Sequence, residues 1–206
     1  MMNKGFANAK EIDAIIRFRG NDKNEVLETE RLLLLPSVNG RDLEEYHRHL
    51  TTEGDFYYQY GMKMTDEILH VCDFESNGVK CFTIFLKSTN EMIGYVGLSE
   101  NGNKEANLEF YIFKDFRQNG YCFEAARKYI DAYFDHEFDD IWGDKVTATT
   151  FFENEPAKGV LLKLGFKSQG IGIRMVPDET EGETDYDCGG MIVSYVLERR
   201  EQAVAA

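Results

Sequence analysis

NLEFYIFKDFRQNGYCFEAARKYIDAYFDHEF, residues 107–138, is the stretch that decides the fold of this chain. Its first part, Asn107–Phe113, is rich in aromatic residues and predicts a strand. After a polar break, a helix is predicted from Arg117 to about Phe138, because apolar residues recur there at helical period. The apolar stripe contains Phe123, Ala126, Ile130 and Phe134. The opposite stripe, which is predicted to be solvated, contains Glu124, Arg127, Lys128, Asp131 and Asp135.

A strand that enters a helix through a tight turn presents unpaired N–H groups at the start of the helix. Together with the positive end of the helix dipole, these groups bind anions such as a pyrophosphate. In this turn Gly120 has no Cβ, so the backbone can approach a ligand closely, and Arg117 can add a charge-assisted contact. Many turns with a glycine and a basic residue bind nothing, so the turn alone leaves phosphate binding open.

A second stretch repeats the strand-to-helix order. Val146–Phe152 predicts a strand, and Asn154 is suited to cap the helix that follows it. Pro156 suits the first turn of that helix, and Gly165 suits its end. The sequence therefore predicts a short second helix before the next strand.

The two stretches together resemble the GNAT N-acetyltransferase superfamily, and within it the branch of ribosomal-protein N-terminal acetyltransferases. The pattern Arg117-x-x-Gly120-Tyr121-x-x-Glu124-Ala125 is similar to the acetyl-CoA loop of that branch. The residues from Asn154-x-x-Ala157 to Lys163-Leu-Gly-Phe166 are similar to its second motif. Thr29–Leu33 and Val193–Tyr195 look like its first and last strands. The resemblance covers residues 29–200.

The resemblance implies one α/β (α+β) domain over residues 29–200, with helices flanking a mixed, mostly antiparallel, V-split sheet. Residues 1–28 are predicted as an N-terminal extension and residues 201–206 as a C-terminal tail. Lys80–Leu86 and Met92–Leu98 are predicted as a hairpin, because a turn signal lies between them. Further strands are predicted at 30–35, 170–175 and 191–197, and further helices at 9–19, 42–50 and 65–74.

Composition excludes several classes of protein. The chain has 206 residues, of which 43% are hydrophobic, which is enough for one globular domain. The net charge of −14 argues against nucleic acid as a partner and favours a cationic substrate. No apolar run reaches the length of a membrane span, and the start of the chain lacks the apolar segment of a signal peptide. The four cysteines have no metal-site spacing, so reduced thiols, no metal and a cytoplasmic location are expected.

The resemblance implies acetyl-CoA as co-substrate and assigns its binding largely to main-chain amides. A bulge in the strand before the loop would turn the amides of Phe110, Tyr111 and Ile112 toward the pantetheine and the thioester carbonyl. The pyrophosphate would meet the amides of the loop, with Arg117 beside them, and Asn154 would contact the cofactor from the second motif. The loop residues are Gln118, Asn119, Gly120, Tyr121 and Cys122.

The chain departs from the pattern of the branch at two positions, and from that of many other superfamily members at a third. Cys122 stands where the branch has Gly or Ala, and Ala157 stands where it has a serine. Leu161 occupies the position at which many members of the superfamily have a general-acid tyrosine. These departures leave a catalytically inactive acyl-CoA-binding module as the alternative to an enzyme.

The general base is also displaced from its usual position. Where the strand of the branch often carries an acid, this chain has Asn107, and a carboxylate returns two residues later at Glu109. Residues 107 and 109 share one face of a strand, so Glu109 is predicted as the base that deprotonates the amine. Glu100 is the alternative base, in which case Glu109 is a rim carboxylate that binds a cationic substrate.

The predicted function is direct transfer of an acetyl group from acetyl-CoA to a primary amine. The acceptor remains open between a small cationic amine and a protein N-terminus. The acidic segment Asp178–Asp187 either collects such an amine or is only a solvated loop. The aromatic cluster Phe56–Tyr60 either forms a wall of the acceptor pocket or packs between helices and sheet. The chain is expected to act as a monomer or a homodimer.

Overall fold

The computed structural model describes residues 25–37, 42, 44–46, 48–49, 79–100, 105–138, 143–177 and 186–199. The strands in these ranges form a single eight-stranded sheet. In chain order they are β1 (Leu27–Glu28), β2 (Leu32–Pro36), β3 (Val79–Leu86), β4 (Glu91–Glu100), β5 (Glu105–Ile112), β6 (Lys145–Phe151), β7 (Lys167–Pro177) and β8 (Tyr186–Glu198). The 3₁₀ helix η2 (Lys114–Phe116) and the α-helices α5 (Tyr121–Phe134) and α6 (Glu155–Leu164) connect the later strands.

The sheet opens in its middle, between β5 and β6. The strand order is β1-β2-β3-β4-β5-β6-β8-β7, and every neighbouring pair is antiparallel except β5 and β6. These two parallel strands pair only from Glu105↔Lys145 to Asn107↔Thr147, although both continue for several residues beyond. This geometry confirms the predicted α/β fold with a mixed, mostly antiparallel, V-split sheet.

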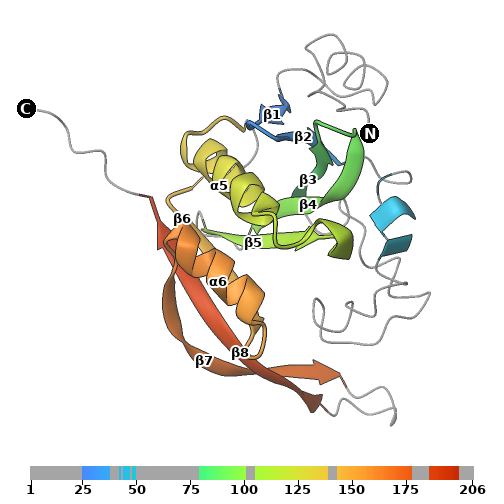
Figure 1. The fold of residues 1–206 in the computed structure, drawn as a ribbon. Helices are drawn as coiled ribbons and strands as arrows, with labels where there is room; N and C mark the ends of the chain where they lie inside the picture. The colour runs from blue at the N-terminus through green and yellow to red at the C-terminus, as the bar shows by residue number, and fades with distance from the viewer. Residues whose placement is uncertain are drawn as a thin grey trace, which may run out of the picture.

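The sheet separates a core face from a second face. Ala106, Leu108 and Ile112 of β5 belong to the hydrophobic core that the sheet shares with α5 and α6, and Figure 1 shows both helices on this side. Alternate residues of a strand point to opposite faces, so the odd-numbered residues of β5 face away from the two helices. On that second face the ring of Tyr111 packs edge-on against Tyr46, with centroids 5.8 Å apart.

Helix α5 is shorter than predicted at both ends. Its predicted start at Arg117 is a turn, and the helix begins only at Tyr121. It ends at Phe134 instead of Phe138, because His136 adopts a left-handed backbone conformation (φ 58°) through which an α-helix does not continue.

The buried stripe of α5 is rotated from the predicted one. Ala126 and Ile130 are buried as predicted, and Tyr129 and Tyr133 are buried beside them. The predicted outer members of the stripe, Phe123 and Phe134, are only half buried. The hydroxyl of Tyr129 donates to a backbone carbonyl of β3, so a tyrosine can lie in this core with its polar atom satisfied.

Helix α6 has the ends that the sequence predicts. The side chain of Asn154 accepts a hydrogen bond from the backbone N–H of Ala157 (3.2 Å), and Pro156 lies in the first turn. Gly165 ends the helix in the left-handed conformation, at φ 99°. These signals act within a few residues of one another, which is why the sequence alone predicts them.

Several predicted features lie outside the described residues. They are the helices at 9–19 and 65–74, the aromatic cluster Phe56–Tyr60, and the acidic segment up to residue 185. Glu100 is the last residue of β4, but its side chain is also outside the described part. Of the predicted helix at 42–50, the described residues are helical. None of the helices within the described ranges is long and apolar enough to cross a membrane.

Candidate active site

The edge of β5 that faces the gap carries backbone groups from its even-numbered residues. In an antiparallel pair, residues that exchange hydrogen bonds alternate with residues whose N–H and C=O point away. The N–H of Phe113 donates to the carbonyl of Ile93 (2.9 Å), and the β4–β5 register from Gly94↔Ile112 to Glu100↔Ala106 contains no shift. Odd-numbered residues of β5 therefore bond to β4, and even-numbered ones direct their N–H and C=O toward β6.

The opposite edge of the gap follows from the same alternation in β6. Arg199 N–H donates to the carbonyl of Asp144 (2.8 Å) at one end of the β6–β8 ladder. Phe152 N–H donates to the carbonyl of Met191 (2.8 Å) at the other end. Even-numbered residues of β6 therefore face β8, and the N–H and C=O groups of odd-numbered residues face β5. Beyond the last paired residues, both strands thus line the gap with backbone groups that suit the amides of a pantetheine arm.

This alternation corrects one part of the predicted cofactor site. The amides of Phe110 and Ile112 face the gap, as the predicted role requires, but the amide of Tyr111 is directed to β4. The predicted bulge is absent from this part of β5, because its register with β4 is regular. The alternation of the strand, and not a bulge, turns the backbone groups toward the gap.

The N-terminus of α5 forms an anion-binding geometry close to the open end of the gap. Gly120 is the N-cap residue in the left-handed conformation (φ 79°), and no side chain of the described residues caps the helix there. No side-chain oxygen of the described residues therefore caps the first N–H groups of the helix, from Tyr121 onward. A Cβ at Gly120 would have only ordinary contacts, so the backbone conformation, and not a lack of space, requires glycine here.

Arg117 connects this loop to β5. Its Nε donates to the carbonyl of Ile112 (2.8 Å), and its guanidinium lies over the ring of Tyr111, 5.2 Å from the centroid. Asn119 closes the turn from the other side, because its side-chain amide donates to the carbonyls of Phe116 and Arg117 (3.2 and 2.9 Å). The residues predicted to bind the pyrophosphate therefore form one hydrogen-bonded turn beside the last residue of β5.

Arg31 and Glu124 form a contact at this loop that the sequence interpretation missed. Glu124 was predicted on the solvated stripe of α5, but its carboxylate accepts from Nε of Arg31 (2.7 Å) and from the backbone N–H of Arg31 (3.0 Å). Nη2 of Arg31 completes the ion pair at 2.6 Å, and the hydroxyl of Thr29 donates to the same carboxylate. The sequence offered one signal for this contact: the segment Thr29–Leu33 and a glutamate in the loop motif are both part of the family resemblance.

The pKa of Glu124 reflects this contact. Partial burial by itself raises the pKa of the carboxyl group, but the hydrogen bonds from Thr29 and Arg31 and the charge of Arg31 outweigh burial and lower it. Glu124 is therefore ionised at neutral pH. Its negative charge, which would repel a phosphate at the start of the helix, is balanced by the guanidinium of Arg31.

Glu109 lies on the second face of the sheet, in a low-dielectric position. It is paired with Gly97 of β4, and Gly97 is paired with Cys81 of β3, so a residue without a side chain separates Glu109 from Cys81. Burial raises the pKa of Glu109, which moves a carboxylate toward the range in which it works as a general base. Burial, together with the nearby charges of Glu109 and Asp42, also raises the pKa of the Cys81 thiol.

A buried polar chain holds the second face together next to Glu109. The hydroxyl of Thr83 donates to Asp42 (3.0 Å), and Ser37 is within hydrogen-bonding distance of the same hydroxyl (2.9 Å). Asp42 and Thr83 are both fully buried. Because Asp42, Thr83 and Ser37 each have a hydrogen-bond partner in this series, their hydrogen bonds fix the helical segment that carries Asp42 against β3.

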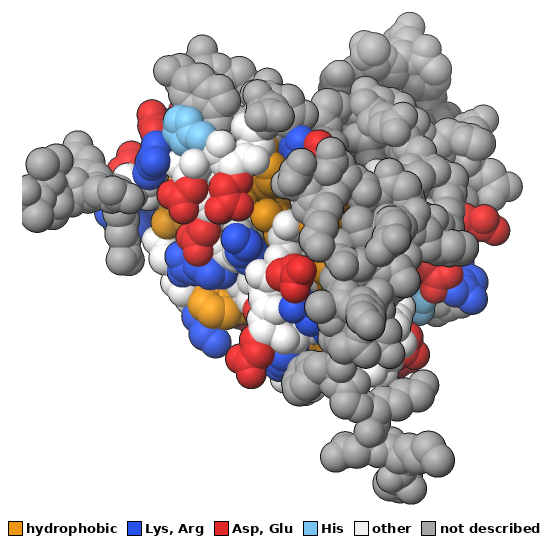
Figure 2. Space-filling model, turned by 90° about the horizontal axis from the view of Figure 1, so that it is seen from above, with side chains coloured by type: hydrophobic (Ala, Val, Ile, Leu, Met, Phe, Trp, Pro, Cys, Tyr) orange, Lys and Arg blue, Asp and Glu red, His pale blue; other side chains and the backbone are white. Residues whose placement is uncertain are grey.

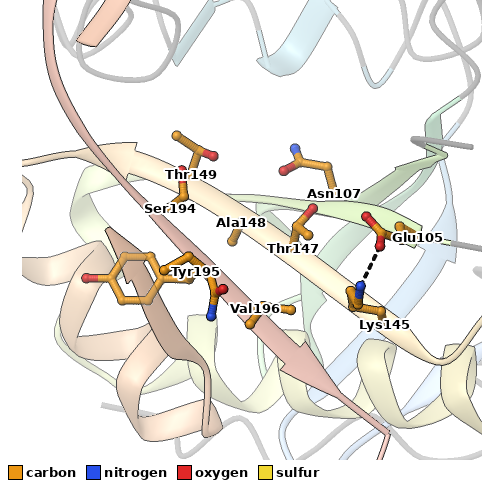
Figure 3. Close-up of a pocket in the computed structure, with 10 residues that line it drawn as sticks. Glu105, Asn107, Lys145, Thr147, Ala148, Thr149, Ser194, Tyr195 and Val196 are labelled. Atoms are coloured by element: carbon orange, nitrogen blue, oxygen red, sulfur yellow. Dashed lines mark hydrogen bonds and ion pairs between the residues drawn. The ribbon is translucent and has the colours of Figure 1, made fainter. Parts of the chain in front are cut away.

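A polar cavity of about 320 Å³ lies at the closed end of the gap (Figure 3). The side chains of Lys145 and Glu105 form an ion pair of 2.5 Å across β5 and β6 at this end. Figure 3 shows Asn107, Thr147 and Thr149 beside it, with hydroxyl and amide groups on one side of the strands. Glu109 is two residues beyond Asn107 on the same face of β5, but it is not one of the residues that line the cavity.

Cys122 and Leu161, two of the positions at which the sequence departs from the family pattern, supply neither a thiolate nor a proton donor to this site. Cys122 packs against the core, and burial raises the pKa of its thiol to about 12, so the thiol is protonated at neutral pH. Leu161 is buried in the core and supplies no proton donor. Among the described residues no group of His, Cys, Asp and Glu could hold a metal ion.

Charges of both signs are interspersed on the described surface. Figure 2 shows acidic and basic side chains next to one another on the face seen from above. Ion pairs such as Lys128–Glu137 (3.7 Å) and Arg199–Asp144 (3.8 Å) belong to this part of the chain. The net charge of −14 is therefore not gathered into a single acidic patch on the described part of that face.

The fold and the site define an acyltransferase, and comparison with known proteins identifies its family. Residues 31–167 match the acetyltransferase (GNAT) domain family, which is more than half of the chain. The chain therefore belongs to the GNAT acetyltransferases, whose donor is acetyl-CoA. This result confirms the expected superfamily, co-substrate and enzyme class.

Individual relatives agree with this assignment. The chain is 24% identical over 157 residues to the uncharacterized N-acetyltransferase YoaA of Bacillus subtilis, covering 71% of this chain and 85% of that protein. Among solved structures, a ribosomal-protein-S5-alanine acetyltransferase from Vibrio fischeri has a TM-score of 0.63 at 14% identity, covering 84% of this chain and 96% of its own. RimL, a ribosomal L7/L12 α-N-protein acetyltransferase in complex with coenzyme A, has a TM-score of 0.62 at 15% identity, covering 85% and 98%. These neighbours share the fold and include the ribosomal-protein branch that the motifs resemble.

Proposed function

We propose that this chain transfers an acetyl group directly from acetyl-CoA to a primary amine, with both substrates bound at the gap between β5 and β6. The observation that carries the proposal is the alignment of three features along one path. The N-terminus of α5 lies at the open end of the gap, backbone groups line the edges of the gap, and Glu109 belongs to the part of β5 that lines it, with its side chain on the second face. Holding both reactants on such a path supplies much of the rate of an acyl transfer.

Each part of the site has a chemical task in this proposal. The loop amides from Gln118 to Cys122 bind the pyrophosphate, and Asn154 contacts the cofactor from the start of α6. The even-numbered amides of β5, those of Phe110 and Ile112, hold the pantetheine and polarise the thioester carbonyl. Glu109 takes the proton from the incoming ammonium group, either directly or through water.

The reaction balances without a further reagent. The neutral amine attacks the thioester carbon, a C–N bond forms, the C–S bond breaks, and coenzyme A leaves as a thiolate. The nitrogen loses two protons in all: the first passes to Glu109 before attack, and the second leaves the nitrogen as the amide forms. One proton reaches the thiolate through solvent, because Leu161 offers no acid at the position of the usual tyrosine, and the other is released to solvent. An amide and coenzyme A are the products.

The acceptor is proposed to be a cationic amine or a protein N-terminus. The net charge of −14 supports a cation, because the summed field attracts an ammonium group. The RimL structure supports a protein N-terminus, since that neighbour is a ribosomal L7/L12 α-N-protein acetyltransferase. The acidic segment Asp178–Asp187 is proposed to collect the amine. A cytoplasmic location, and a monomer or homodimer, are part of the same proposal.

An amine panel with acetyl-CoA tests the proposal. Polyamines, aminoglycosides and peptides with free N-termini are each incubated with the chain, and coenzyme A release is followed by its thiol. Peptides with blocked N-termini and no lysine serve as controls. We expect amine-dependent release with at least one class and a product that has gained one acetyl group by mass. Binding of acetyl-CoA without release by any amine would instead establish an inactive acyl-CoA-binding module.

A further inference from the structure

We propose that Arg31 is the positioning residue of the pyrophosphate loop: it holds one loop carbonyl on its own side and thereby turns the N–H of Gly120 toward the phosphate. The inference rests on the proposed function only in placing the pyrophosphate at the N-terminus of α5. Arg31 belongs to the turn between β1 and β2, 88 residues before the loop residue that it holds.

Each of the three guanidinium nitrogens of Arg31 contacts the loop or the helix that follows it. Nη1 donates to the carbonyl of Asn119 (3.0 Å), whereas Nε and Nη2 both contact one carboxylate oxygen of Glu124 (2.7 and 2.6 Å). The guanidinium also lies over the ring of Tyr121, 4.5 Å from its centroid. A planar fork is suited to such a set of contacts, because its donors have fixed directions.

The contact at Asn119 determines the direction of the next amide. In a trans peptide the C=O of one residue and the N–H of the following residue point in opposite directions. Because the carbonyl of Asn119 points to Arg31, the N–H of Gly120 points away from Arg31, to the other side of the loop. The left-handed conformation of Gly120 (φ 79°) then leads into the first turn of α5, where the N–H groups of the helix are presented.

Glu124 fixes Arg31 in this position and does not bind the ligand itself. Its carboxylate accepts hydrogen bonds from the backbone N–H and from Nε of Arg31, and the hydroxyl of Thr29 donates a third. The carboxylate lies in the first turn of α5, so the helix that uses the N–H groups also holds the arginine that orients them. Loss of either partner should therefore disorder the same amide.

The test compares two acetyl donors. Acetyl-CoA contains the pyrophosphate, whereas S-acetyl-N-acetylcysteamine contains the thioester and part of the pantetheine arm only. For Arg31→Gln we expect KM for acetyl-CoA to rise at least tenfold, about 1.4 kcal/mol, with kcat within threefold of wild type. With the short donor, KM should change by less than threefold. An equal rise in KM for both donors would show a general structural defect and overturn the positioning role.

A matched arginine controls for the loss of a charge and a hydrogen bond. Arg127 also belongs to this domain, donates to a backbone carbonyl (Leu164, 2.8 Å) and lies over an aromatic ring of α5, but it does not contact the loop. Arg127→Gln should leave KM for acetyl-CoA within twofold. A rise equal to that of Arg31→Gln would mean that any arginine of this helix region matters equally, and the inference would be wrong.

A conservative variant separates geometry from charge. Arg31→Lys keeps the positive charge but cannot hold Asn119 and Glu124 together, so its affinity for coenzyme A should fall nearly as far as that of Arg31→Gln. Full affinity in Arg31→Lys would show that charge alone is sufficient. Calorimetry with coenzyme A gives this answer without turnover, so the result stands even if no amine is acetylated. Circular dichroism on each variant identifies those that fold, and Glu124→Gln replaces Arg31→Gln if the latter does not.

Discussion

Replacing Gly94 with alanine should separate β4 from β5, the strand whose opposite edge faces the gap that the acetyl donor uses. A Cβ at this position would lie 2.0 Å from the carbonyl oxygen of Tyr111, whereas real Cβ contacts are essentially never shorter than 3.0 Å. Strands β4 and β5 would therefore have to separate by about 1 Å, and the bond from Phe113 N–H to Ile93, now 2.9 Å, would lengthen past the hydrogen-bonding range. The backbone of Gly94 (φ 152°) adds a second penalty, because alanine rarely adopts it.

These effects have a calculable size. Two weakened ladder hydrogen bonds cost about 1 kcal/mol each, and the backbone strain costs about 1–3 kcal/mol, so Gly94→Ala should lose about 3–5 kcal/mol of unfolding free energy. At roughly 2–4 °C per kcal/mol for a domain of this size, Tm should fall by about 10 °C. Urea unfolding measures the free energy, and calorimetry with coenzyme A measures the accompanying loss of affinity.

Gly159 provides the matched control. It lies inside α6, and a Cβ there would meet no atom within 4 Å. Gly159→Ala should therefore stabilise the protein by about 0.5–1 kcal/mol, because alanine is the better helix former. The same chemical change thus has opposite signs at two positions. A Gly94→Ala variant as stable as wild type would refute the close approach of β4 and β5.

Two variants and one chemical modification test the site and its surroundings. Glu109→Gln should lower kcat on the order of a hundredfold and remove the acidic limb of the pH–rate profile, and unchanged kcat with a higher KM for the amine would make Glu109 a binding carboxylate. Because burial raises the pKa of Glu109 from the usual 4.5, its protonated form is favoured on folding, and this contribution is lost as pH rises through the folded pKa. Glu109→Gln should therefore unfold at a higher temperature than wild type at neutral pH, with no difference near about pH 4. The Cys122 thiol, which is partly buried and has a raised pKa, should resist alkylation at pH 7 in the folded protein and react in urea, whereas rapid reaction when folded would contradict that raised pKa. Asn154→Ala should cost about 1 kcal/mol of unfolding free energy through loss of the helix cap, and Glu153→Ala, one residue earlier and exposed, should cost nothing measurable.

The features that were predictable from the sequence depend on residues close together in the chain. Gly120 at the start of α5 and Gly165 at the end of α6 both adopt left-handed conformations, at positions where the sequence predicted turns. Asn154 caps the start of α6. The strands also occur where aromatic and β-branched residues are dense. Each of these features is decided by chemistry within about one helical turn, so no knowledge of the tertiary structure is needed.

The features that were mispredicted depend on contacts between distant residues. Helical period placed Glu124 on the solvated side, but the turn between β1 and β2 covers that side with Arg31, which is 93 residues away. The direction of the Tyr111 amide depends on the register with β4, and no local pattern encodes it. The end of α5 was placed too late because Asp135 and His136 are not strong helix-breaking residues, and no glycine or proline marks the end.

Initial-rate kinetics with both substrates varied give the most direct test of the central claim, that the acetyl group passes directly from a thioester in the β5–β6 gap to an amine. Both described thiols, those of Cys81 and Cys122, are held protonated by burial, so we expect no acetyl-enzyme. Double-reciprocal plots should give lines that intersect, as for a ternary complex, and no burst of coenzyme A should precede addition of the amine. Parallel lines with a burst of coenzyme A in the absence of amine would show a covalent intermediate and contradict the account.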